Sequence, residues 1–383
     1  MEEWKECKLK DICDYGKGRT EVSSLDNSTY ISTENMLPNR AGITTATTLP
    51  TGEYTPGFEI DDTLVSNIRP YFKKIWKATF SGGCSADVLV FKAKENVSKE
   101  YLYYVLADDE FFKYSMATSK GTKMPRGDKT SILNYPVNLP PLPTQQKIAA
   151  ILSSLDDKIE LNNKINTNLE QQIETLLLDY LSKKETTSVK LGDYLYIKGR
   201  IGWKGLKKNE YLSESKYRSI NVETLTKSGI DWNKAGYISE ERYTESPEIM
   251  LQIGDILLSK DGTIGKIGYV DELELPTSVA SGIFVIRNNN PSVISTTFIY
   301  YLLKSKLFDS FNIARTEGSV IPHLYQKDFM DFDFPLPSPE LMNEFEKTTS
   351  PMFNQIINNL KENKKLNSLC NSLLPKLMNG EII

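Results

Sequence analysis

The feature that most constrains the fold is an internal duplication, in which short motifs recur in the same order about 190 residues later. The matching pairs are Leu9-x-Asp11 with Leu191-x-Asp193, Ile31-x-x-Glu34 with Ile220-x-x-Glu223, Asp62-x-Leu64-x-Ser66 with Asp255-x-Leu257-x-Ser259, Tyr103-Tyr104 with Tyr300-Tyr301, Gly121-x-x-x-Pro125 with Gly318-x-x-x-Pro322, and Pro141-Leu142-Pro143 with Pro335-Leu336-Pro337. The separation drifts between 182 and 197 residues, as loop insertions in two related domains would produce. The conserved order predicts two similar lobes, an arrangement typical of proteins that read a two-part target.

Each half begins with short β-branched and aromatic segments that are broken by Gly, Pro and Asn, a pattern that predicts strands. The clearest are Thr63–Ile68, Asp87–Phe91, Asp255–Ser259 and Ile283–Ile286. Helical spacing of Tyr, Leu and Phe follows at Ser98–Leu106 and Ser295–Leu303, and we expect the tyrosine pairs there to belong to the core rather than to a base-stacking site. Each half is therefore expected to be a mixed α+β domain.

A proline-rich junction ends each half, and a long helical pattern follows it. Apolar residues from Ile148 to Tyr180 are spaced alternately by three and four, which is the seam of a coiled coil. Ser154 has the form of an N-cap and Pro351 suits a first helical position, so we expect a break there, followed by a helix of about 28 residues, or roughly 42 Å. Two such helices in one chain are expected to pair antiparallel and to act as a spacer rod with one domain at each end.

Asparagines recur in the middle of both seams, at Asn162, Asn163, Asn166, Asn359, Asn363 and Asn367. Buried asparagines would fix the register of the pair at some cost in stability, whereas exposed ones would carry no such role. The sequence leaves both readings open. The expected organisation is a first domain at 1–142, a helical region at 143–183, a second domain at 184–337 and a second helical region at 338–383.

Composition excludes several classes of protein. With 383 residues, 39% of them hydrophobic, the chain can bury two cores, and no stretch approaches the ~18 apolar residues of a membrane helix. The acidic opening Met1-Glu2-Glu3 does not resemble a secretory signal. Four cysteines without CxxC spacing and the one histidine, His323, predict neither a metal site nor a disulfide framework. We therefore expect a cytoplasmic protein without membrane contact.

Patterns that carry catalysis are also lacking in the sequence. The single histidine excludes most acid–base and triad schemes that use one. The glycine-rich stretch Gly262–Gly268 resembles a phosphate cradle, but it lacks the four-residue interval and the terminal Ser/Thr of a P-loop, so a hairpin between strands is favoured. We expect no catalytic residue, no bound cofactor and no metal.

Local basic clusters stand out against a net charge of −4. The segment from Tyr196 to Lys208 holds five positive and no negative residues, and Arg69, Lys73, Lys74 and Lys77 surround Pro70, Tyr71, Phe72 and Trp76. Any single cluster can be an ordinary solvated loop. The agreement between the two halves favours a functional reading as nucleic-acid-binding loops.

These features resemble the specificity (S) subunit of type I restriction-modification systems. The likeness covers the whole chain and is carried by Leu139-Pro140-Pro141-Leu142-Pro143-Thr144-Gln145-Gln146, by Leu373-Leu374-Pro375-Lys376-Leu377 near the end, and by Gly254–Ser259. The second junction departs from the family's pattern, because Pro339-Glu340-Leu341-Met342 stands where a glutamine is usual.

The resemblance implies a non-catalytic subunit with two target recognition domains, each reading one half of a bipartite, asymmetric sequence in double-stranded DNA. It also implies that the helices set the spacer and dock two methyltransferase (M) subunits, which act on adenine with S-adenosylmethionine. Restriction/translocase (R) subunits would join through the complex and use ATP and Mg²⁺. None of these cofactors is expected on this chain.

Candidate DNA contacts lie in basic loops that the two halves share. They are Lys17, Arg19, Arg69, Lys73, Lys74, Lys120, Lys123 and Arg126 in the first half, and Lys198, Arg200, Lys204, Lys260, Lys266 and Arg315 in the second. The alternative hypothesis is a coiled-coil adaptor, or an orphan regulator, that binds protein rather than specific DNA.

Overall fold

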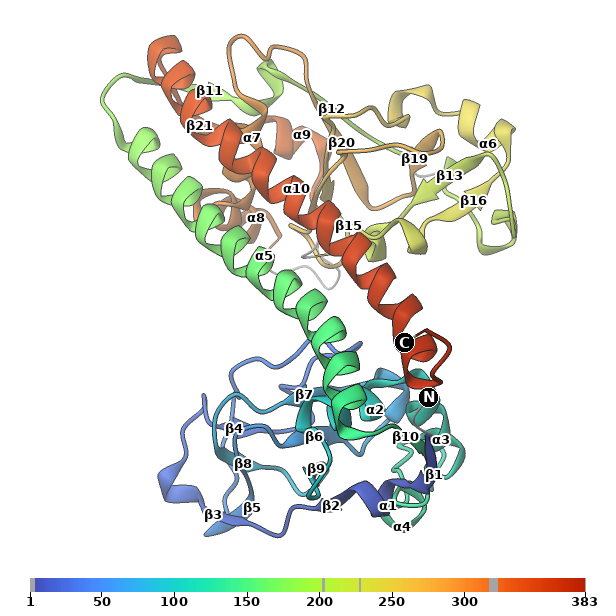
Figure 1. Ribbon diagram of the computed structural model, residues 1–383. Helices are drawn as coiled ribbons and strands as arrows, with labels where there is room; N and C mark the ends of the chain where they lie inside the picture. Colours follow the sequence, from blue (N-terminus) through green and yellow to red (C-terminus); the bar gives the residue numbers. More distant parts are fainter. Residues whose placement is uncertain (1–3, 202–203, 227–228, 317–322, 383) are drawn as a thin grey trace. The chain divides into compact units, whose positions relative to one another are not determined.

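The structure is a computed structural model that describes residues 4–201, 204–226, 229–316 and 323–382. The chain divides into two compact units, the first formed by Met1–Ile159 with Lys365–Ile383 and the second by Glu160–Lys364. Both units mix strands and helices (Figure 1), as the sequence predicted. Each unit is described by itself below.

The first unit contains two four-stranded sheets with helices packed against them. Its elements are β1 (Lys5–Lys8), α1 (Leu9–Ile12), β2 (Cys13–Tyr15), β3 (Arg19–Glu21), β4 (Tyr30–Ile31), β5 (Tyr54–Phe58), β6 (Thr63–Ser66), β7 (Ile75–Lys77), β8 (Gly82–Cys84), β9 (Val88–Ala93), α2 (Lys99–Ala107), α3 (Asp109–Ala117), α4 (Lys129–Ile132), β10 (Pro136–Leu139) and the first part of α5 (Leu142–Ser182). The central sheet is antiparallel, in the order β2-β9-β6-β7, and the outer sheet is β3-β5-β8-β4, with β4 and β8 parallel.

The second unit repeats the central sheet in the order β12-β20-β17-β18, whereas its outer sheet has only β16-β13-β19 among the described residues. Its elements are β11 (Thr186–Lys190), β12 (Leu195–Gly199), β13 (Tyr217–Ile220), β14 (Leu225–Thr226), β15 (Gly229–Ile230), β16 (Gly236–Ile238), α6 (Glu240–Thr244), β17 (Ile256–Ser259), β18 (Ile267–Tyr269), β19 (Thr277–Val279), β20 (Ile283–Asn288), α7 (Thr296–Lys304), α8 (Lys306–Thr316), α9 (Gln326–Met330), β21 (Asp333–Pro337) and most of α10 (Pro339–Met378). The duplication is therefore structural and extends from the sheets to the helices.

A buried aspartate explains why one motif recurs in both central sheets. Asp62 and Asp255 each accept a hydrogen bond from the backbone three residues earlier and precede the strands β6 and β17. Asp255 also forms a two-pronged ion pair with Arg287 of β20, at 2.7 and 2.8 Å. In the first unit Lys92 lies 3.4 Å from Asp62 at the corresponding place on β9. The motif thus closes the turn that leads into the central strand of each sheet.

The helix that the spacing predicted after each sheet begins at a serine cap. Ser98 Oγ accepts a hydrogen bond from Tyr101 N at 3.2 Å at the start of α2, and Ser295 Oγ accepts one from Phe298 N at 3.1 Å at the start of α7. Tyr104 is buried and donates its hydroxyl to Asp156 at 2.8 Å. Tyr301 is buried as well, and Tyr103 and Tyr300 are half-buried and pack against the two cores, so the expectation that the pairs belong to the core is confirmed.

The predicted break in the long helices is wrong. Helix α5 runs without interruption for 41 residues and α10 for 40, which is roughly 60 Å each at about 1.5 Å per residue. Ser154 Oγ bonds back to the carbonyl of Ile151 at 2.7 Å instead of capping a new helix. Pro351 lies inside α10 and lacks an N–H donor, but the buried side chains of Phe353 and Ile356 beyond it keep the helix packed on the core.

Buried asparagines join α5 and α10 within the second unit. Asn162 Nδ2 donates to Asn363 Oδ1 at 2.9 Å, and Asn359 Nδ2 donates to Asn166 Oδ1 at 2.7 Å. Because the position rises on one helix as it falls on the other, the pairing is antiparallel, as predicted. These four side chains are 8% exposed or less, which decides the open question in favour of burial at these sites, while Asn163 and Asn367 are exposed.

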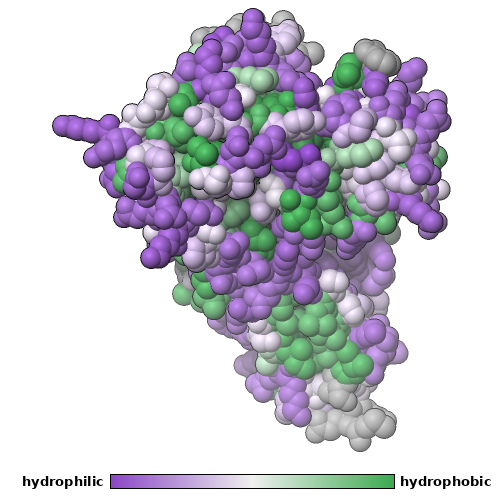
Figure 2. Space-filling model, turned by 90° about the horizontal axis from the view of Figure 1, so that it is seen from above, coloured by the Kyte–Doolittle hydropathy of each residue, from purple (hydrophilic) through white to green (hydrophobic). Residues whose placement is uncertain are grey.

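Hydrophilic residues dominate the face drawn in Figure 2, with smaller hydrophobic areas between them. Among the described residues, none of the helices combines the length and the apolar character that crossing a membrane would require.

Candidate nucleic-acid interface

A cleft in the first unit brings together three of the predicted basic residues. It has a volume of about 560 Å³, and Arg69, Lys74 and Arg126 line it, together with the acidic residues Glu34 and Asp87. These residues come from the loop after β4, the tip of the β6–β7 hairpin, the loop before β9 and the loop before α4. The basic residues were found from sequence, but their acidic neighbours were not, because only the sheet brings those loops together.

The hairpin tip, residues 67–74, is held in a tightly specified conformation. A single 3₁₀ turn, Pro70–Phe72, lies between Arg69 and Lys73, both of which have a left-handed backbone with φ of 51° and 50°. Such a conformation is costly for residues other than glycine and persists only where surrounding contacts impose it. Arg69 N donates to Pro125 O at 2.8 Å, and Asn39 N donates to Phe72 O at 2.8 Å.

The basic side chains at this tip differ in whether their donor groups are already paired within the protein. Lys74 Nζ donates to Thr33 O at 2.6 Å, and burial lowers the pKa of its ammonium group. Lys73 lies 2.8 Å from the carboxylate of Asp109. The Arg69 Nε is buried without a hydrogen-bond acceptor among the described residues. Lys73 and Lys74 are thus partly committed to holding the tip, and Arg69 keeps an unmet donor at the cleft.

The loop before α4 carries the remaining candidates of this region. Arg126 pairs with Asp87 at 3.1 Å, and Lys120 pairs with Asp128 at 2.6 Å. The hydrogen bond from Lys120 lowers the pKa of Asp128 to about 2. Lys123 is exposed.

Lys17 and Arg19 lie outside the lining of the cleft. Both are exposed, on the segment that enters β3, and Arg19 lies over the ring of Tyr54 at 5.7 Å. They remain predicted contacts on a separate part of the first unit.

In the second unit, the β17–β18 hairpin occupies the place of the β6–β7 hairpin. Backbone hydrogen bonds close both tips in the same way, from Ser66 N to Lys74 O at 3.0 Å and from Ser259 N to Lys266 O at 2.9 Å. Gly262 and Gly265 adopt φ of 67° and 91°, which the turn requires. The glycine-rich stretch is therefore a hairpin, as predicted. Lys260 lies over the ring of Phe284 at 5.1 Å.

His323, which was not among the predicted DNA contacts, pairs with this hairpin. His323 contacts Asp261 through Nδ1, and the two residues form an isolated β-bridge. Arg126 stands at the corresponding place of the first unit, where it bridges to Ile68. The exposed Arg315 pairs with Asp328 at 3.3 Å.

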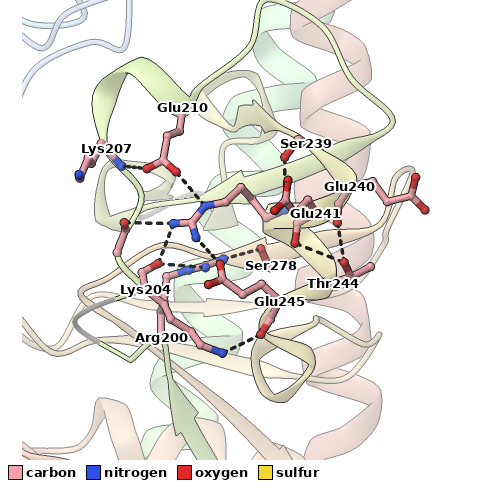
Figure 3. A network of polar contacts seen from close by, with 12 residues as sticks. Arg200, Lys204, Lys207, Glu210, Ser239, Glu240, Glu241, Thr244, Glu245 and Ser278 are labelled. Carbon is pink, nitrogen blue, oxygen red and sulfur yellow. Dashed lines mark hydrogen bonds and ion pairs between the residues drawn. The ribbon is translucent and has the colours of Figure 1, made fainter.

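Arg200 requires a correction, because its side chain is only 2% exposed. Its guanidinium donates to Ser278 Oγ at 3.2 Å (Figure 3) and to Val279 O at 2.9 Å, and burial lowers its pKa. These contacts use the guanidinium inside the second unit, so Arg200 is a structural residue here rather than a surface contact for phosphate. Sequence alone could not separate it from its exposed neighbours.

Lys204 belongs to the same network. Its ammonium donates to Glu245 O at 2.8 Å, and its carbonyl accepts from Arg242 of α6 at 3.0 Å (Figure 3). Arg242 also pairs with Glu210 at 3.0 Å, so the network ties the loop that follows β12 to α6. Lys198, on β12, is half-buried and lies over Tyr196 at 5.9 Å.

Comparison with known proteins adds independent findings. A family model described as the type I restriction modification DNA specificity domain matches residues 1–171 and 183–369. The type I restriction enzyme MjaVIII specificity subunit of Methanocaldococcus jannaschii is 25% identical over 100% of this chain and 93% of its own length. The HindI specificity subunit of Haemophilus influenzae is 23% identical, with 100% of both chains covered. A crystal structure of the S subunit of the type I system of M. genitalium shares the fold, with a TM-score of 0.61, 18% identity and coverage of 98% of this chain and 96% of that one.

Proposed function

The chain belongs to the type I restriction modification DNA specificity family, and from this premise we propose that each of its two domains reads one half of a bipartite, asymmetric DNA sequence. The observation that carries this proposal is a repeated frame with unlike tips. The same four-stranded sheet, capped helix and buried aspartate occur twice, while the hairpin tip carries Arg-Pro-Tyr-Phe-Lys in one unit and Asp-Gly-Thr-Ile-Gly in the other.

Basic side chains at the loops support contact with DNA. Lysine and arginine neutralise phosphates and position the protein, whereas sequence is read by groups that reach the base edges. The exposed Lys17, Arg19, Lys120 and Lys123 suit the first task.

The two long helices suit a spacer that also docks partner subunits. Their buried asparagine pairs specify one antiparallel register, and a fixed register gives a fixed separation between half-sites. We propose that two methyltransferase subunits dock on these helices and supply S-adenosylmethionine chemistry, and that restriction subunits supply ATP- and Mg²⁺-dependent steps. The chain itself would be a non-catalytic cytoplasmic subunit that binds none of these cofactors.

Specific binding tests the proposal directly. The purified complex with its methyltransferase partner is titrated onto the motif that methylome sequencing of the host identifies, and onto a scrambled duplex at the same salt concentration. We expect tighter binding to the motif and a steep loss of affinity with salt for both duplexes. Equal affinity for motif and scrambled DNA would refute the proposal and favour a protein-binding adaptor.

A helix insertion tests the spacer role. Duplicating the facing segments Asn163–Leu169 of α5 and Ile356–Glu362 of α10 adds one heptad to each helix, or about 10.5 Å. At about 3.4 Å per base pair, the unread spacer is expected to lengthen by about three base pairs. A folded variant with the original spacing would refute this role.

A further inference from the structure

The hairpin tip of the first unit presents chemistry that the repeated frame does not require. Tyr71 is 49% exposed and Phe72 is 38% exposed, and their ring centroids lie 4.7 Å apart. The equivalent tip of the second unit has no aromatic residue, yet its hairpin closes with the same backbone hydrogen bonds. The exposed rings are therefore unnecessary for the fold of the hairpin, which points to a role at the surface.

Contacts around the tip fix how it is presented. Besides the two left-handed residues that bracket the 3₁₀ turn, Arg40 N donates to Lys73 O at 3.0 Å, and Arg40 Nε donates to Ala107 O at 2.6 Å. The tip is thus anchored to the helical layer through the loop at residues 39–40. A tip held in this way meets a ligand without a large loss of conformational entropy.

The lining of the cleft suits a base edge better than a phosphate. Three cations, Arg69, Lys74 and Arg126, share it with the two carboxylates of Glu34 and Asp87, so the local charge is close to balanced. Apolar groups also line it, among them Phe72 and the exposed Met124. Phosphate sites favour an excess of positive charge, whereas a base edge in the major groove offers acceptors, donors and the thymine methyl group.

Arg126 is positioned to be the reading residue of this cleft. Its backbone bonds Lys120 in both directions, at 2.9 and 3.0 Å, and its side chain is about half exposed. Asp87 accepts from one terminal nitrogen of the guanidinium at 3.1 Å. A guanidinium has five N–H donors, so the fork keeps donors for a further pair of acceptors while Asp87 orients it.

We propose that the cleft of the first unit receives a base edge in the DNA major groove, and that Arg126 reads a guanine there through its O6 and N7 atoms. The apolar wall at Phe72 and Met124 shields these hydrogen bonds from water. His323, paired with Asp261, stands at the corresponding place of the second unit, so the two half-sites are read by different chemistry. This inference rests on the proposed function and names the specificity residue within it.

Methylome sequencing with Arg126→Lys tests the assignment in the intact complex. Lysine keeps the charge but loses the two-pronged geometry that matches guanine. We expect one guanine position in one half-site to become degenerate, with discrimination falling about 5- to 150-fold, while the other half-site stays unchanged. Lys113→Gln is the matched control, because Lys113 is exposed and pairs only locally with Glu110 in the same unit. It should leave the motif intact.

Binding to modified DNA separates base reading from phosphate contact. In a duplex with 7-deazaguanine at the assigned position, pairing is kept but the N7 acceptor is lost. We expect the wild-type complex to bind this duplex more weakly than the unmodified one. The Arg126→Lys complex should bind the two duplexes with nearly equal affinity. An equal loss of affinity for every sequence in the variant would mean a phosphate contact and overturn the inference. A wild-type complex with no sequence preference would instead refute the proposed function itself.

Discussion

The asparagine pair Asn166–Asn359 allows a quantitative test of how α5 and α10 are held together. Both side chains are buried, at 8% and 4% exposure, and the amide of Asn359 donates to Asn166 Oδ1 at 2.7 Å. Replacing one partner by leucine leaves the buried Nδ2 of Asn359 or the buried Oδ1 of Asn166 without its partner, which costs about 1–3 kcal/mol. Replacing both removes the pair together, and the second amide no longer needs a partner.

The losses in unfolding free energy of the two single variants should therefore add up to more than the loss of the double variant. We expect a coupling energy of about 1–3 kcal/mol between Asn166→Leu and Asn359→Leu. The double variant should approach wild-type stability, since Nδ2 of Asn166 is already buried without an acceptor among the described residues. Gln355, which also bonds Asn359, is exposed and can turn to water.

The measurement is the free energy of unfolding from urea titrations followed by the circular dichroism of the helices. Asn358→Ala is the control, because Asn358 is exposed on the same helix and its replacement should change stability by no more than about 0.5 kcal/mol. Single effects that simply add in the double variant would show that the two amides do not interact, and the register argument would fail with them.

Three further predictions concern single side chains. Asp255→Ala should cost about 3–5 kcal/mol of unfolding free energy because it strands the Arg287 guanidinium, and calorimetry should show a smaller loss for Asp62→Ala, whose lysine partner is more exposed. Arg200→Ala should lower the melting temperature of the chain without relaxing the methylated motif; a relaxed motif at unchanged stability would contradict its structural role. Burial raises the pKa of Asp156, so the folded protein gains stability relative to Asp156→Asn as the pH falls through that raised pKa toward about 4. A constant difference in melting temperature between the two proteins from pH 8 to 4 would contradict this.

The duplication and the elements near it were readable from sequence because they depend on local rules. Ser98 and Ser295 each stand directly before a helical pattern and cap the helix that follows. The Asp-x-Leu-x-Ser motif marks a turn into a buried strand in both halves. The break expected at Ser154 failed for the opposite reason. A local cap signal there competes with the packing of a long apolar seam, and packing wins.

The sequence could not tell which candidate contacts lie at the surface, because composition does not reveal exposure. Arg200 and Lys198 lie two residues apart, yet one is buried in a hydrogen-bonded network and the other is half-buried on the strand before it. Glu34 and Asp87 were noted only as parts of a repeated motif and a predicted strand, and the sequence did not place them beside Arg126, since their loops are separated from it by tens of residues.

The sequence by itself determined that the chain is built twice on one frame, with two long helices and chemically different loops, because periodicity, caps and motif order are local properties. Only the tertiary structure decided which cations stay available, that the asparagines face each other across the helix pair, and that Arg126 meets Asp87 at a cleft. Those features arise from distant segments that the sheets and the helix pair bring together, and exposure and pairing are properties of that assembly rather than of any one segment.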